Sequence, residues 1–274
     1  MLPEVEQYFR IEKLPHMWCP GCGNGIVLHS LVNAISGLGL NQDKTVIVSG
    51  IGCASRAAGY LDFDTLHTTH GRALAFATGI KFSRPELNVF VLMGDGDCTA
   101  IGGNHLIHAA RRNINLTAIV FNNHIYGMTG GQYSPMTPSK KRATTAVFGS
   151  VERAFNLPEL VKGAGATYVA RATTYHTALL TNLIMEAHKN KGFSLVEVIT
   201  ACPTAYGRYN KLGSPAEMLK AQRENAVNIK DLRGSNGEVP EGKVVIGELY
   251  RAEAPEYIEE YLAAVKALQE KGGK

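Results

Sequence analysis

The chain has 274 residues, 45% of them hydrophobic, and is long enough to bury the core of one large domain or of one domain with an appendage. Its 28 lysines and arginines exceed its 24 aspartates and glutamates only slightly, so no nucleic acid partner is expected. No apolar run reaches the ~20 residues of a membrane span, the N-terminus lacks the apolar segment of a signal peptide, and the five cysteines do not resemble a secreted disulfide framework. We therefore expect a cytoplasmic protein without membrane contact.

Apolar patterns of helical and of strand type alternate along the chain. The strand-like runs are almost uniformly apolar, as in parallel sheets with helices on both faces. The predicted helices are 25–38, 73–83, 104–113, 157–166 and 176–190, and the predicted strands are 45–50, 88–94, 116–122, 167–173 and 193–200. The alternation predicts an α/β fold with a doubly wound, mostly parallel sheet.

The pattern changes at about residue 203, where the sequence becomes charged and is interrupted by glycine and proline. Only two further helices are predicted there, near 215–226 and 255–270. We therefore divide the chain into a domain of residues 1–210 and a C-terminal extension of residues 211–274.

Four of the unusual motifs follow predicted strands. The sequences IGCAS, DGDC, NHIYGMTGG and ACPT come after the strands 45–50, 88–94, 116–122 and 193–200. Ligands of doubly wound sheets bind outside the carboxyl ends of the strands. The motifs are thus predicted to meet at one edge of one sheet.

The GDGD sequence at 94–97 has features of an anion site. Glycines at a strand end let backbone N–H groups approach an anion, and a helix that begins after Asp97 adds the positive end of its dipole. A carboxylate there would repel a phosphate unless a cation lay between them. Asp95, the amide oxygen of Asn123 and a loop carbonyl form an oxygen-only set that suits Mg²⁺.

The CxxC pair Cys19 and Cys22 fits a redox dithiol, half of a zinc site or part of an iron–sulfur cluster. No strand precedes the pair, unlike in thioredoxin-type proteins, and zinc sites usually use two compact pairs. Cys53 and Cys202 are single and share the predicted sheet edge, which suits a cluster bound from scattered loops. For each cysteine, burial without a ligand role is the alternative. Cys98 has no assigned role.

The sequence GDG, with NN following so that Asn123 lies 28 residues after Asp95, resembles the thiamine diphosphate fingerprint. The resemblance implies that Asp95, Asn123 and the carbonyl of Ile125 hold Mg²⁺ on the diphosphate. The glycine-rich sequence YGMTGGQ at 126–132 would wrap around the cofactor.

Over about residues 10–210, the motifs WCPGCGNG, GIGCASR, HTTHGRA, GDGD, NNHIYGMTGGQ and ACPT resemble the β subunit of a 2-oxoacid:ferredoxin oxidoreductase of the 2-oxoglutarate type. The resemblance implies the thiamine-diphosphate-binding fold and a [4Fe–4S] cluster on Cys19, Cys22, Cys53 and Cys202. His67 is expected to be structural. The predicted thiamine diphosphate contacts are Ile51, Gly52, Cys53, Ala54, His70, Gly94, Gly96, Asp97, Gly127, Met128 and Thr129.

The implied activity is oxidative decarboxylation of a 2-oxoacid to an acyl-coenzyme A, with electrons passing through the cluster to ferredoxin. Arg56 lies where family members that accept 2-oxoglutarate can carry a lysine, and Met128 matches a position that helps to separate long from short 2-oxoacids. We therefore favour 2-oxoglutarate, with pyruvate or another 2-oxoacid as the alternative. The direction, oxidative or CO₂-fixing, stays open.

The resemblance also implies a partner. Thiamine enzymes take a catalytic glutamate from a second, similar domain, and this chain is predicted to contain only one such sheet. The resemblance implies that an α subunit, or a fused γ–α subunit, supplies this glutamate and the pyrimidine domain. Residues 211–274 are expected to dock on it, in a heterodimer or a dimer of heterodimers. Two functions of other classes remain as alternatives: a non-oxidative thiamine diphosphate lyase or synthase, and a zinc-stabilised binding module.

Overall fold

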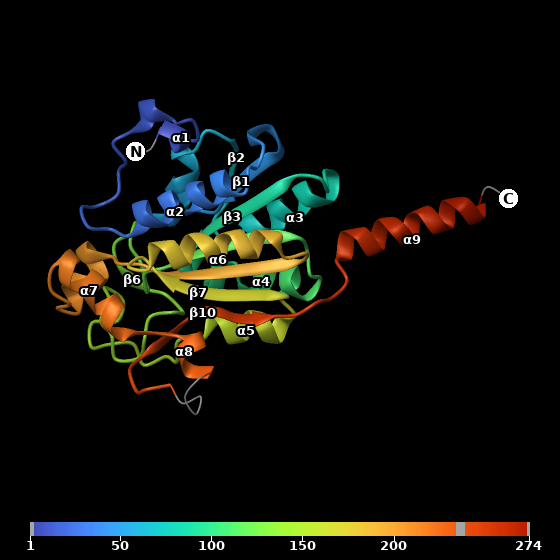
Figure 1. Ribbon diagram of the computed structural model, residues 1–274. Coiled ribbons are helices and arrows are strands. Elements are labelled where there is room, and N and C mark those ends of the chain that lie inside the picture. Colours follow the sequence, from blue (N-terminus) through green and yellow to red (C-terminus); the bar gives the residue numbers. More distant parts are fainter. Residues whose placement is uncertain (1–2, 234–238, 273–274) are drawn as a thin grey trace.

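The computed structural model describes residues 3–233 and 239–272, and its centre is a twisted sheet between two layers of helices (Figure 1). The described strands of this sheet lie in the order β2-β1-β3-β4-β8-β7-β10-β9. Their bounds are β1 (Thr45–Ser49), β2 (Asp64–His67), β3 (Asn88–Gly94), β4 (Leu116–Asn122), β7 (Tyr168–Thr173), β8 (Phe193–Ile199), β9 (Ala226–Asn228) and β10 (Val244–Arg251). A separate antiparallel pair joins β5 (Ile125–Tyr126) to β6 (Gln132–Tyr133).

The five predicted strands correspond to β1, β3, β4, β7 and β8, and adjacent members of this group pair in parallel. The doubly wound, mostly parallel α/β prediction is confirmed. Parallel pairing brings the carboxyl ends of these strands to one edge, as the pairing of Asn122 with Ile199 at the ends of β4 and β8 illustrates. The motifs that follow β1, β3, β4 and β8 therefore share that edge.

Helices cover both faces because alternate residues of the central strands point to opposite sides. Ile47 packs in the core beneath α2 and α6, whereas its neighbours Val46 and Val48 pack beneath α3, α4 and α5. The α-helices are α1 (Pro3–Glu6), α2 (Asn24–Gly37), α3 (Ala73–Ser83), α4 (Gly103–Arg111), α5 (Leu157–Ala164), α6 (Thr177–Lys189), α7 (Pro215–Asn225), α8 (Ile229–Arg233) and α9 (Tyr257–Gly272). Tighter or wider helical turns occur at Ile11–Lys13, Gln42–Lys44, Ala54–Tyr60, Asp97–Ile101 and Pro203–Gly207.

Three strands of the main sheet were missing from the sequence prediction. β2 is short, half-exposed and mostly polar, so its sequence lacks the apolar signal of a buried strand. The prediction of helices alone after residue 203 was wrong, because β10 pairs antiparallel with β7 and β9 pairs parallel with β10. A strand at the sheet margin needs only one apolar face, which makes its pattern weak.

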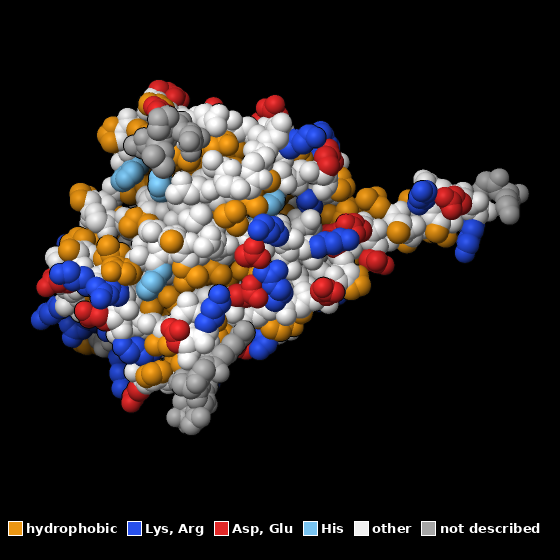
Figure 2. Space-filling view, in the orientation of Figure 1, with side chains coloured by type: hydrophobic (Ala, Val, Ile, Leu, Met, Phe, Trp, Pro, Cys, Tyr) orange, Lys and Arg blue, Asp and Glu red, His pale blue; other side chains and the backbone are white. Residues whose placement is uncertain are grey.

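The last helix, α9, leaves the body of the molecule (Figure 1). It is anchored near its start: the side chain of Ile258 is 2% exposed, and the rings of Tyr257 and Tyr261 lie 5.8 Å and 5.7 Å from that of Phe82. Hydrophobic side chains lie exposed along the rest of the helix (Figure 2), with Tyr261 49%, Leu262 46% and Leu268 70% exposed. None of the helices in the described ranges combines the length and the apolar composition required to cross a bilayer.

Candidate active site

A cavity of about 480 Å³ lies at the sheet edge where β1, β3 and β4 end. Every predicted thiamine diphosphate contact and every predicted magnesium ligand lines it, although these residues come from four separate segments of the chain. The predicted lining residues are Ile51, Gly52, Cys53, Ala54, His70, Gly94, Asp95, Gly96, Asp97, Asn123, Ile125, Gly127, Met128 and Thr129. Phe121, Tyr126 and Gln132 also line the cavity. Tyr126 and Gln132 belong to the sequence 126–132 that was predicted to wrap around the cofactor, whereas Phe121 was not predicted.

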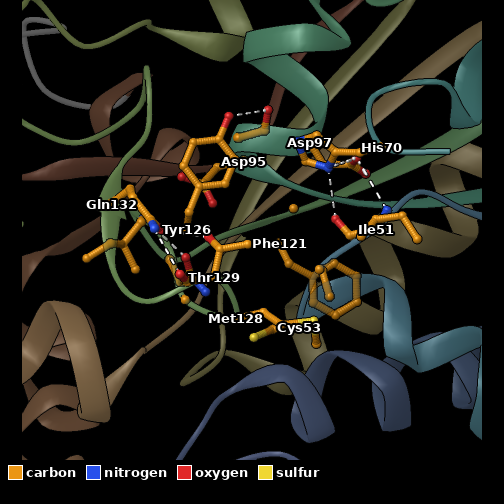
Figure 3. A pocket seen from close by; sticks show the side chains of 17 residues that line it. Ile51, Cys53, His70, Asp95, Asp97, Phe121, Tyr126, Met128, Thr129 and Gln132 are labelled. Carbon is orange, nitrogen blue, oxygen red and sulfur yellow. Dashed lines mark hydrogen bonds and ion pairs between the residues drawn. The ribbon is translucent and has the colours of Figure 1, made fainter. Parts of the chain in front are cut away.

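Different kinds of side chain line two sides of the cavity (Figure 3). Asp97, His70 and Ile51 gather on one side, whereas Cys53 lies close to Met128 on another. Between β3 and the loop after β4, Tyr126 packs against Gly96: its hydroxyl donates to the Gly96 carbonyl over 3.1 Å. A Cβ atom at position 96 would lie 2.2 Å from the Tyr126 ring, so this contact requires glycine.

Asp95 is a buried carboxylate, 2% exposed, at the end of β3. Burial raises the pKa of the Asp95 carboxyl to about 7, against the opposing effect of hydrogen bonds from Ser134 and from backbone N–H groups. No lysine, arginine or histidine of the described chain forms an ion pair with it. A divalent cation would supply the missing positive charge, and the nearby oxygens of Asn123 and Ile125 are of the type that Mg²⁺ prefers.

The turn after β4 presents these two oxygen donors. Asn123 Oδ1 accepts a hydrogen bond from the Ile125 N–H over 3.2 Å, and the residue between them, His124, has a φ of 63°. Few residues other than glycine adopt such a conformation. Thr137 Oγ1 supports the turn by donating to the His124 carbonyl over 2.5 Å.

A buried ion pair lies behind this turn and was missed by the sequence prediction. Glu197 on β8 is 1% exposed, accepts from Asn122 Nδ2 over 2.7 Å and pairs with Arg171 Nε at 2.6 Å. Asn122 Oδ1 in turn accepts from the His124 N–H over 3.1 Å. The first asparagine of the NN motif therefore ties the turn to β8. The signal in the sequence was a glutamate inside the apolar strand FSLVEVIT.

Four cysteines converge beside the cavity. A Cβ atom on Gly127 would lie 3.5 Å from Cys53 Sγ and 3.6 Å from Cys202 Sγ, so these sulfur atoms are at most about 7 Å apart. Thr204 Oγ1 donates to Cys19 Sγ over 3.6 Å and lies 3.9 Å from Cys202 Sγ. Burial, and then the neighbouring sulfurs, raise the pKa of the Cys22 thiol to about 12 and that of the Cys53 thiol to about 11.

Two contacts hold the CxxC loop against the motifs after β1 and β8. Trp18 Nε1 donates to the Cys53 carbonyl over 2.7 Å, and the Gly23 N–H donates to the Ala201 carbonyl over 3.4 Å. None of the five cysteines forms a disulfide bond. No three histidine, cysteine, aspartate or glutamate side chains among the described residues are placed to hold a single metal ion. The wider convergence of four thiols suits a polynuclear cluster better than one zinc ion.

Cys98 and Arg56 lie outside both groups. Cys98 is fully buried in the core beneath α3 and α4, and burial raises the pKa of its thiol well above the ordinary value. Arg56 is exposed in the turn after Cys53, does not line the cavity, and has no hydrogen bond or ion pair within the described chain. Its charge acts on His67, whose pKa is lowered by burial and then by Arg56.

The fold and the composition of the cavity define the class of thiamine-diphosphate-binding domains. Residues 50–198 match the family model described as the thiamine pyrophosphate enzyme, C-terminal TPP binding domain. The matched range contains the cavity segments that follow β1, β3 and β4.

Similarity to individual proteins extends beyond this domain. The 2-oxoglutarate synthase subunit KorB of Methanocaldococcus jannaschii is 50% identical over 96% of this chain and 97% of its own length. The subunit of the same name from Archaeoglobus fulgidus is 56% identical over 82% of each chain. The structure of the 2-oxoglutarate:ferredoxin oxidoreductase from Magnetococcus marinus, with 2-oxoglutarate, coenzyme A and succinyl-CoA bound, is 34% identical with a TM-score of 0.86, over 97% of this chain and 90% of that chain.

The chain belongs to the β subunits of the 2-oxoacid:ferredoxin oxidoreductases. It is thus a subunit of an oxidoreductase, which argues against the zinc-stabilised binding module and the non-oxidative thiamine diphosphate enzyme.

Proposed function

We propose that this β subunit holds thiamine diphosphate, Mg²⁺ and one [4Fe–4S] cluster in an enzyme that converts 2-oxoglutarate and coenzyme A to succinyl-CoA and CO₂. The reaction releases two electrons and one proton, and the electrons pass through the cluster to ferredoxin. The reverse, CO₂-fixing reaction uses the same groups and is tested by incorporation of labelled CO₂ into 2-oxoglutarate.

The observation that carries the proposal is that Cys53 belongs to both parts of the site. Its side chain lines the cavity, and its sulfur lies within about 7 Å of the Cys202 sulfur. Bound thiamine diphosphate stabilises the negative charge left when a 2-oxoacid loses CO₂, and an iron–sulfur cluster accepts electrons singly. Because Cys53 is shared by the cofactor cavity and the proposed cluster site, electrons would have only a short distance to travel between them.

The residues at the end of β3 and after β4 are proposed to hold the cation and the diphosphate. Asp95, Asn123 and the Ile125 carbonyl provide oxygen ligands for Mg²⁺. The glycines at positions 94 and 96 leave the backbone accessible to an anion. The other cavity residues named above would orient the cofactor.

The substrate proposal rests on Arg56. An exposed guanidinium with no ion pair in the described chain is available to a carboxylate, and it can bind one through two parallel hydrogen bonds. The distal carboxylate of 2-oxoglutarate is the group that pyruvate lacks. The names of the archaeal relatives and the ligands of the Magnetococcus marinus structure support this choice.

The partner in this proposal is an α or fused γ–α subunit that supplies the catalytic glutamate and the pyrimidine domain. Residues 211–274 remain our proposed docking segment, supported by the exposed apolar side chains of α9. The complex would be a heterodimer or a dimer of heterodimers.

The test is the complex of this chain with its partner subunit, purified without oxygen. We expect a brown protein that contains iron and reduces ferredoxin when 2-oxoglutarate, coenzyme A, Mg²⁺ and thiamine diphosphate are present, with slower turnover of pyruvate. Serine at position 19, 22, 53 or 202 should lower the iron content, whereas Cys98→Ala should not. A colourless, iron-free complex, or iron loss only in Cys98→Ala, would contradict the proposal.

A further inference from the structure

Asp97 is the second buried carboxylate of the cavity, 2% exposed. Its Oδ1 atom accepts from the Gly71 N–H over 2.6 Å and from the Ile51 N–H over 3.4 Å, and lies 2.9 Å from His70 Nδ1. Figure 3 shows Asp97, His70 and Ile51 grouped in this way. Asp97 thereby joins the segments that follow β1, β2 and β3.

The second oxygen, Asp97 Oδ2, is buried and has no hydrogen-bond partner within the described chain. It lies against Gly50, where a Cβ atom would be only 1.9 Å away. Position 50 therefore requires glycine for the carboxylate to keep this place. The hydrogen bonds from the Gly71 and Ile51 N–H groups hold the carboxylate with Oδ1 turned toward His70.

The hydrogen bonds of His70 determine which ring nitrogen carries a proton. Nδ1 lies 2.9 Å from Asp97 Oδ1 and 3.2 Å from the Ile51 carbonyl oxygen. Both oxygens are acceptors, so Nδ1 must be the donor. In the neutral imidazole the lone pair is then on Nε2. The side chain of His70 is 34% exposed and lines the cavity, so this nitrogen is available to a bound molecule.

We infer that Asp97 is a positioning residue, which fixes the Nδ1–H form of His70 and thereby presents Nε2 to the cavity as a hydrogen-bond acceptor. Asp97 acts through His70 and need not touch the ligand itself. A carboxylate that orients a functional imidazole through Nδ1 is a general device of enzyme sites. The inference deepens the proposed function and rests on it for the role of His70 in turnover.

The first test is independent of that function. Nitrogen-15 chemical shifts of the imidazole, measured on the full chain without cofactors, should show His70 in the Nδ1–H form. In Asp97→Ala this form should lose its predominance, whereas Asp97→Asn should retain it because the amide oxygen replaces Oδ1 as acceptor. Asp43→Ala, at an exposed aspartate, is the matched control. An unchanged His70 signal in Asp97→Ala would overturn the inference.

The second test is a double-mutant cycle in the complex with the partner subunit, with 2-oxoglutarate as substrate. His70→Ala and Asp97→Ala should each lower kcat/KM by about ten- to a hundredfold, the usual effect of losing a hydrogen bond to a charged group. The double variant should be no worse than His70→Ala, because Asp97 acts through the imidazole. Losses that multiply would show that Asp97 acts by itself and would overturn the inference.

Two outcomes separate this inference from the proposed function. If His70→Ala leaves kcat/KM unchanged, the positioning role in turnover is overturned while the proposed function stands. If the wild-type complex turns over no 2-oxoacid, the proposed function fails, and the imidazole shifts alone then decide whether Asp97 positions His70. If Asp97→Ala does not fold, Asp97→Asn decides the question. In that variant His70 should stay in the Nδ1–H form, and kcat/KM should fall by less than about tenfold. Loss of the Nδ1–H form or a larger fall in kcat/KM would overturn the inference.

Discussion

Asp95 is the residue at which folding and function make opposite demands. A buried carboxyl without a counter-ion favours its protonated form, and its pKa of about 7 expresses that cost. Because the folded-state pKa lies above the ordinary value of 3.8, the contribution of Asp95 to stability is complete at pH values below 3.8. That contribution is lost as the pH rises through 7. Binding of a cation would instead favour the ionised form of the Asp95 carboxyl.

We therefore predict that Asp95→Asn stabilises the metal-free chain at high pH. The gain in unfolding free energy should be small near pH 4 and grow toward pH 7, by at most about 1.4 kcal/mol per pH unit. Thermal unfolding in EDTA at pH 4, 6 and 8 measures it, with Asp43→Asn as the exposed control. Adding Mg²⁺ and thiamine diphosphate should raise the Tm of the wild type and not that of Asp95→Asn. Equal pH dependence in both proteins would refute this prediction.

Arg56 carries the prediction for substrate choice. Arg56→Ala should raise the KM for 2-oxoglutarate by about ten- to a hundredfold, since a hydrogen bond to a charged group contributes about 1.5–3 kcal/mol. Turnover of pyruvate should be similar or better. The measurement is steady-state kinetics of the complex with both substrates, with Arg56→Lys as the charge-preserving control. If both substrates slow equally, Arg56 serves the fold or a subunit contact.

At the level of elements, β8 supports the turn after β4 through a charged pair. Removing one partner of a buried ion pair leaves the other charge uncompensated. Glu197→Ala should therefore lower the free energy of unfolding by about 3 kcal/mol and weaken the binding of Mg²⁺ with thiamine diphosphate. Denaturant unfolding and calorimetric titration measure the two effects. The control is Glu186→Ala, at a half-exposed glutamate on α6 whose ion pairs with Lys189 and Arg251 lie at the surface. A loss of stability in Glu197→Ala no larger than that in Glu186→Ala would contradict the proposed support.

The order of the strands explains how the contacts of Glu197 with Asn122 and Arg171 can support the turn after β4. β8 lies beside β4 in the sheet, although more than 70 residues separate their paired positions. Sequence patterns predict that each strand exists, because an apolar run is a local signal. They do not predict which strands are neighbours. The contact between Asn122 and Glu197 therefore became visible only in the folded chain.

For the whole molecule, nothing within the described chain covers the exposed hydrophobic side chains of α9, which are Tyr261, Leu262 and Leu268. An isolated helix of this length is marginal in water, so contact with the proposed partner would stabilise it. Deletion of residues 262–274 keeps the anchors Tyr257 and Ile258, and should change the Tm of this chain little. Copurification with the partner subunit should weaken markedly. A complex of undiminished affinity would show that α9 is not part of the interface.

The sequence by itself determined the class of fold, the edge of the sheet that carries the motifs, and the segments that line the cavity. These depend on local patterns, namely apolar strands, glycines at strand ends and polar residues directly after them. Only the tertiary structure decided that β10 joins the sheet, that Glu197 supports the turn holding Asn123, and that the carboxylate of Asp97 faces His70. The physical reason is that such contacts join residues far apart in the chain, and the free energy of burying them depends on partners that no local pattern identifies.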